Sequence, residues 1–141
     1  MTGGPVCILA AVRRVVLLAV AAFVLALAGT AAAAGTPSDT VRQQDTLIRA
    51  GKFQALYQLY SPKFRAKCPY GKWVKAAPAA RKALQGVTLK VIGYQVSQGG
   101  DQAFVSYKYL QGSKVVYSTT TDLYVLVHGK WLDELDKGTS C

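Results

Sequence analysis

The spacing of apolar residues changes once along this chain, near Gly86, and that change restricts the fold more than any other feature. Before it, four residues recur at the spacing of one helix face: Phe53, Leu56, Tyr57 and Tyr60. After it, alternation with a period of two predicts strands over 87–96, 103–110, 114–127 and 130–135. Short turns join the strands without a helical crossover, so we expect an antiparallel meander. Helices followed by strands predict an α+β domain, with N-terminal helices packed on a curved four-stranded antiparallel sheet.

The helical part of the sequence divides into short segments. Ser38 or Asp39 can cap a first helix that runs to about Ala50. Pro62 suits the first position of a further helical turn. After a second turn near residues 68–69 the helical pattern returns, and Pro78 should kink or split it because proline lacks an amide hydrogen.

The first 34 residues have the composition of a secretory signal peptide. Arg13 and Arg14 precede an apolar run over 15–28, and an alanine-rich tract over 29–34 ends in an Ala-x-Ala pattern. We therefore predict cleavage before Gly35 and a single mature domain over 35–141, secreted or otherwise extracytoplasmic. The alternative is an uncleaved N-terminal membrane anchor, because the 20 apolar or small residues from Val15 onward are just long enough to span a bilayer.

The charge of the chain is lopsided. Seventeen Lys and Arg face seven Asp and Glu, a net charge of +10, which falls to +8 when Arg13 and Arg14 leave with the signal. No acidic residue lies between Thr46 and Gly100. For an exported domain such a field predicts an anionic envelope surface or an exported protein as partner, or a basic surface with no partner. Nucleic acid is not expected, because no recognition motif is present. The candidate basic binding surface comprises Lys72, Lys75, Arg81 and Lys82.

Two cysteines remain in the predicted mature domain, Cys68 and Cys141. Cysteines of exported domains usually pair, because the compartment is oxidising. We expect a structural disulfide that ties the C-terminal residue to the helical region. A CxxC motif is absent, so a thioredoxin-like redox role is not supported.

The order of elements resembles the nuclear transport factor 2-like superfamily, in particular its small exported bacterial members. The residues that carry the resemblance are the segment 53–65, the basic helix after it, and a meander that ends in Gly129-Lys-Trp-Leu132. The resemblance covers about 39–137 and implies helices on a curled sheet around a cone-shaped hollow. The superfamily includes ketosteroid isomerases, polyketide cyclases, dehydratases and non-catalytic binding domains, and a shared fold does not choose between these functions.

One acidic residue, Asp122, lies in the middle of a predicted strand. Catalytic members of such a fold keep a carboxylate base inside the cone, and by alternation Asp122 shares a face with Thr120 and Tyr124. If this face lines the hollow, Asp122 can act as a base while Tyr57, Tyr107 or Tyr109 donates to a developing oxyanion. The alternative is that Asp122 faces solvent or pairs with a lysine. His128 is expected in an exposed hairpin turn.

Three functions stay open. The favoured one is an exported, non-enzymatic domain that binds a partner protein, an envelope surface or a small apolar ligand. The second is a small isomerase or cyclase centred on Asp122, and the third is a membrane-anchored envelope accessory protein, if the N-terminal segment is not cleaved. No cofactor or metal site is expected, because nucleotide-binding glycine motifs, a nucleophile elbow and metal-ligand spacings are all absent from the sequence. Oligomeric state has no signature in the sequence.

Overall fold

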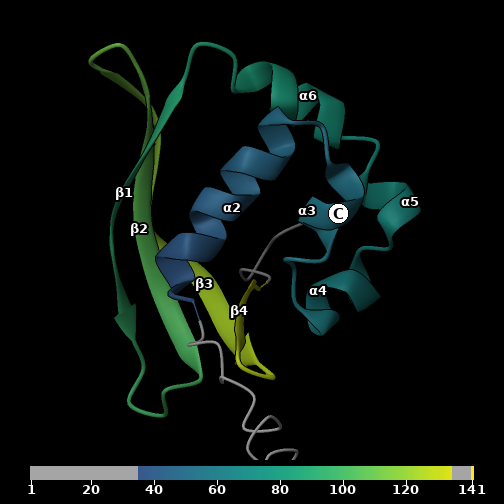
Figure 1. Ribbon diagram of the computed structural model, residues 1–141, viewed down its shortest axis with the longest axis vertical. Helices are drawn as coiled ribbons and strands as arrows, with labels where there is room; N and C mark the ends of the chain where they lie inside the picture. The colour runs from purple at the N-terminus through teal and green to yellow at the C-terminus, as the bar shows by residue number, and fades with distance from the viewer. Residues whose placement is uncertain (1–34, 135–140) are drawn as a thin grey trace, which may run out of the picture. The chain divides into compact units, whose positions relative to one another are not determined.

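The computed structural model describes residues 35–134 and Cys141, and every structural statement below concerns these residues (Figure 1). The described residues belong to a single compact unit. The predicted signal segment 1–34 and Leu135, the last residue of the predicted strand 130–135, lie outside the described residues. Within the described part of the chain, no helix is long and apolar enough to cross a membrane.

The predicted fold class is confirmed. Five helices precede the strands in the described part of the chain: α2 (Pro37–Arg49), α3 (Phe53–Tyr57), α4 (Pro62–Lys67), α5 (Tyr70–Trp73) and α6 (Ala77–Ala83). The four strands are β1 (Thr88–Val96), β2 (Gln102–Gln111), β3 (Lys114–Val127) and β4 (Lys130–Asp133). They form one antiparallel meander in the order β1-β2-β3-β4. Helix α2 lies across one face of this sheet (Figure 1).

Helix α2 begins earlier than predicted. Its N-cap is Thr36, whose hydroxyl accepts a hydrogen bond from the Asp39 amide at 3.2 Å, while the Asp39 carboxylate accepts one from the Thr36 amide at 2.8 Å. This reciprocal capping box satisfies two otherwise unpaired helix-end donors. The prediction that Ser38 or Asp39 is the cap was wrong, because Pro37 fits the first helical turn and moves the cap to the residue before it.

The short helices follow the proline positions. Pro62 opens α4 behind an N-cap at Ser61, whose hydroxyl accepts from the Phe64 amide at 3.0 Å. Pro78 lies in the first turn of α6, so the predicted split is confirmed. The predicted helical stripe does not continue to Tyr60, because this residue leaves the helix and forms a parallel bridge with Asp133 of β4.

Two apolar clusters among the described residues form the core of the domain. The first lies between α2 and the sheet and consists of Val41, Val105 and Tyr124, with half-buried Trp131 packed against it. The second lies among the short helices and contains Tyr57, Phe64 and Cys68, with Tyr60, Tyr70 and Trp73 packed around it. The predicted disulfide is present: Cys68 is bonded to Cys141, with 5.4 Å between their Cα atoms.

Candidate functional site

A hydrogen-bonded network crosses from the sheet to α2 and is centred on Asp122. The Tyr107 hydroxyl lies 2.9 Å from Asp122 Oδ2, and the Tyr124 hydroxyl lies 3.2 Å from the same oxygen. Tyr124 also lies 2.8 Å from Gln44 Oε1, and Gln44 Nε2 donates to Asp133 Oδ2 at 2.8 Å. A phenol carries one proton, so Tyr124 can donate to only one of its two acceptors at a time. The network therefore joins α2, β2, β3 and β4 through polar groups.

Tyr107 and Tyr124 are held in their neutral form. Burial, followed by the charges of Asp133 and Asp122, raises the pKa of Tyr124 far above its usual range. Burial and then Asp122 do the same to the pKa of Tyr107. These hydroxyls remain proton donors at any physiological pH, because ionising them would put a second negative charge beside a carboxylate in a poorly solvated place.

The structure brings together only part of the predicted catalytic set. Asp122 is half-buried on the helix-facing side of the sheet and contacts Tyr107, as an active-site arrangement requires. Tyr57 is elsewhere: its hydroxyl donates to the backbone oxygen of Cys68 at 2.7 Å, inside the second cluster. Its predicted place beside Asp122 was wrong, because α3 turns this side chain toward α4 and α5.

Tyr109, the third tyrosine of the predicted catalytic set, interacts with Asp45 of α2. Burial first, and then the charge of Asp45 on α2, raises the pKa of this tyrosine. Sequence reasoning missed Gln44 and Asp45. A signal for both was present, because they lie three and four residues after buried Val41 and therefore on the same face of α2.

Irregular pairing changes which β3 residues face α2. Val105 pairs with Asp122, but Tyr107 pairs with Thr119, so β3 carries one extra residue between these two pairs. After such a bulge, each side chain of the strand points to the opposite face of the sheet from the one that regular alternation predicts. The expectation that Thr120 shares the face of Asp122 was therefore wrong, and Thr119 takes that place. The prediction that Tyr124 shares this face is confirmed.

The bulge also brings Tyr117 to the helix-facing side, where it pairs with Tyr109. The rings of Tyr107, Tyr109 and Tyr117 lie 6.0–6.3 Å apart, centroid to centroid. Beside them, residues of α6 and of the β2–β3 hairpin line an open pocket of about 480 Å³. Its lining is Ala80, Ala83, Leu84, Val87, Tyr109, Val116 and Tyr117. Two of these apolar side chains, Val116 and Tyr117, are 46% and 53% exposed.

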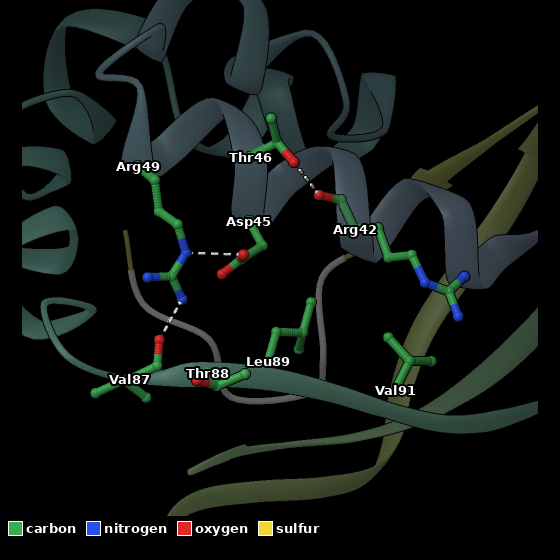
Figure 2. Close-up of a pocket in the computed structure, with 8 residues that line it drawn as sticks. All are labelled: Arg42, Asp45, Thr46, Arg49, Val87, Thr88, Leu89 and Val91. Atoms are coloured by element: carbon green, nitrogen blue, oxygen red, sulfur yellow. Dashed lines mark hydrogen bonds and ion pairs between the residues drawn. The ribbon is translucent and has the colours of Figure 1, made fainter. Parts of the chain in front are cut away.

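A second pocket, also of about 480 Å³, lies between α2 and β1 and is polar on its helix side (Figure 2). There the Arg49 guanidinium donates to Asp45 Oδ2 and to the backbone oxygens of Leu84 and Val87, each at 2.8 Å. The hydrogen bond to Asp45 raises the pKa of Arg49. Since these contacts join α2 to the loop before β1, we assign Arg49 a structural role.

All four candidate basic residues are exposed: Lys72 lies on α5, Lys75 in the turn before α6, and Arg81 and Lys82 on α6. One of them has a structural contact, because Arg81 Nε donates to the Arg49 backbone oxygen at 2.9 Å and so caps the end of α2. Binding of an anionic envelope surface by this group stays a prediction. His128 is exposed in the β3–β4 turn with a φ of 49°.

Strongly alkaline solution is expected to destabilise the fold. Tyr60, Tyr107, Tyr109 and Tyr124 have folded-state pKa values raised above the ordinary value of 10.0. Above about pH 10 the unfolded chain therefore loses tyrosine protons that the folded chain retains. The neutral buried tyrosines contribute fully to the free energy of unfolding below pH 10, and this contribution is lost as the pH rises above 10. Urea unfolding at pH 9, 10 and 11, with tyrosinate absorbance recorded, would measure the loss. Stability that stays constant over this range would contradict the burial of these hydroxyls.

Comparison with protein-family models, curated proteins and solved structures found no match for this chain.

Proposed function

We propose that this protein is a non-enzymatic binding domain that holds a small apolar ligand in the pocket between α6 and the β2–β3 hairpin. The observation that carries the proposal is the composition of this pocket. Five of its seven lining residues are aliphatic and the other two are tyrosines. Small-molecule sites in proteins are typically concave, mostly apolar and several hundred cubic ångströms in volume, with a few polar groups that orient the ligand. The Tyr109 and Tyr117 hydroxyls are the polar groups available here.

The solvent exposure of apolar side chains that line the pocket supports ligand binding, because residues that serve only the packing of the domain would be buried. Val116 and Tyr117 leave about half of their surface in water, although both sit beside a concave apolar site. Covering such side chains stabilises a complex by about 25 cal/mol for each Å² of apolar surface removed from water. A planar or aliphatic ligand of modest size would cover both side chains together with Leu84.

The Asp122 network favours a structural role over the isomerase-type alternative. Both tyrosine hydroxyls approach the same carboxylate oxygen, and one of them also reaches Gln44 on α2. These contacts occupy the groups that a reaction would need as base and donor. Asp122 is also absent from the lining of the two pockets described above.

We further propose that the chain is an exported member of the nuclear transport factor 2-like superfamily. The helix-then-meander order and the helix laid across one face of the sheet support this assignment. The disulfide supports export, because such bonds persist in oxidising compartments. N-terminal sequencing of the protein recovered from culture medium or periplasm tests both cleavage before Gly35 and export.

A neutral fluorescent probe tests the pocket. N-phenyl-1-naphthylamine should bind saturably to residues 35–141, with a fluorescence increase on leaving water. Val116→Asp, which puts a charge into the lining, and Ala83→Trp, which fills the space, should each weaken binding at least about tenfold. Phe104→Asp is the matched control, because Phe104 is 42% exposed on β2 but does not line the pocket. Absence of saturable binding, or equal loss in the control, would refute the proposal. Circular dichroism checks that each variant is folded.

A further inference from the structure

The two edges of the sheet differ in how their backbone groups are used. At β4, the Ser61 amide donates to the Asp133 oxygen at 2.7 Å, and the Asp133 amide donates to the Leu59 oxygen at 2.9 Å. The segment 59–61 therefore covers that edge. At the other edge, β1 is the outermost strand (Figure 1), and no hydrogen bond among the described residues reaches its outward backbone groups. An open edge of this kind is a template for another strand.

The hydrogen bonds between β1 and β2 show which backbone N–H and C=O groups of β1 point away from β2. The Ser97 amide donates to the Gln102 oxygen at 2.8 Å, on the side that faces β2. Hydrogen-bonding direction alternates along an antiparallel strand, so Gln95 also faces β2, while Tyr94 and Val96 direct their N–H and C=O groups outward. The side chains of these same two residues are 42% and 46% exposed. The end of β1 thus presents free backbone groups and uncovered apolar side chains together.

We propose that β1 pairs antiparallel with β1 of a second copy of this chain, around a twofold axis at Gln95. In this register Tyr94 of each copy lies opposite Val96 of the other. Both residues have outward backbone groups, so each such pair exchanges both of its N–H···O bonds. An aromatic residue opposite a β-branched one is also a favourable cross-strand pair. Because the axis is twofold, one short segment supplies both halves of the contact.

Charge and strand geometry select a second copy and limit the contact to a short segment. No charged residue lies between Val91 and Gly100, so two copies of this strongly basic chain can meet here without opposing like charges. A register shift between Val91 and Gly93 interrupts regular pairing toward the start of the strand. The contact is therefore smaller than a typical stable interface, and we expect a weak, concentration-dependent dimer.

A cysteine cross-link tests the register. In the proposed dimer, Gln95 of one copy lies opposite Gln95 of the other in a non-hydrogen-bonded pair. The Cα atoms of such a pair lie about 4.5 Å apart, which is within the range that a disulfide can bridge. Gln95→Cys in residues 35–141 should give a disulfide-linked dimer on mild oxidation, resolved by non-reducing electrophoresis and peptide mass analysis. Gln98→Cys is the matched control, because Gln98 is exposed in the adjoining turn and outside the paired segment. Failure of Gln95→Cys to cross-link, or equal cross-linking of the control, would overturn the proposal.

Sedimentation velocity gives an independent measurement without new cysteines. Residues 35–141 without substitutions should change from monomer to dimer as the protein concentration rises from about 10 μM to 1 mM. Val96→Lys should remain monomeric over this range, because it puts like charges into the contact. Phe104→Lys, on the neighbouring strand with its side chain 42% exposed, should still dimerise. A unit that is monomeric throughout, or a dimer that Val96→Lys leaves intact, would contradict self-pairing at β1.

Discussion

Replacing Tyr124 by alanine is expected to lower the free energy of unfolding by about 3–5 kcal/mol. Tyr124 has no exposed surface, and it packs between Val41 of α2 and Val105 of β2. Removing the ring deletes buried apolar contacts and leaves a cavity that a backbone hydrogen-bonded on both sides cannot close. The hydrogen bonds of its hydroxyl are lost as well. Urea unfolding followed by circular dichroism measures the change.

Two variants separate the ring of Tyr124 from its hydroxyl. Tyr124→Phe keeps the packing but removes a proton donor from between Asp122 and Gln44, which should cost about 1–3 kcal/mol. Phe104→Ala removes an aromatic ring that is already 42% exposed, so its effect should be well below that of Tyr124→Ala. If Tyr124→Ala cost no more than Phe104→Ala, the first cluster would not be the core of the domain.

Loss of the Cys68–Cys141 disulfide is the second large effect that we expect. The bond closes a loop with a sequence separation of 73 residues. In the chain-entropy model, a cross-link of this span destabilises the unfolded state by on the order of 4 kcal/mol. For a domain of this size, such a change lowers the melting temperature by roughly 20 °C. Thermal unfolding of residues 35–141 with and without a reducing agent measures it.

Single substitutions show whether the cross-link itself is responsible. Cys141→Ala removes the bond but leaves buried Cys68 in its cluster, so its melting temperature should match that of the reduced protein. The same variant should no longer respond to the reducing agent. Two titratable thiols in the native unit, or a melting temperature unaffected by reduction, would show that the pair does not stabilise the fold.

Much of the fold was predictable because it depends on local sequence. Pro62 and Pro78 open helices where proline is tolerated, and glycine-containing turns separate strands whose alternation is visible in the sequence. The sequence-based predictions were wrong where a second interaction competed with the expected one. Thr36, rather than Ser38, caps α2 because Pro37 follows it, and Tyr60 leaves its helix because β4 offers it a pairing partner.

The candidate site was less predictable because its contacts are distant in sequence. Asp122 and Tyr107 were correctly considered together, and they meet because their strands are neighbours in the meander. Gln44 lies 80 residues from Tyr124 and 89 from Asp133, and no pattern along the chain links them. Which face of α2 meets which end of the sheet is decided by packing of the whole domain.

The sequence by itself determined the order of helices and strands, the helix breaks at proline, and the pair of cysteines available to bridge. These features follow from backbone constraints and side-chain periodicity within a few residues. Only the tertiary structure decided that a bulge in β3 turns Tyr117 toward the apolar pocket, and that among the described residues a segment covers the edge of β4 while none covers that of β1. The physical reason is that register is a property of two strands together. One extra residue moves the side chains beyond it to the opposite face, up to the next irregularity in pairing. An edge strand is covered only when a segment from elsewhere in the chain pairs with it.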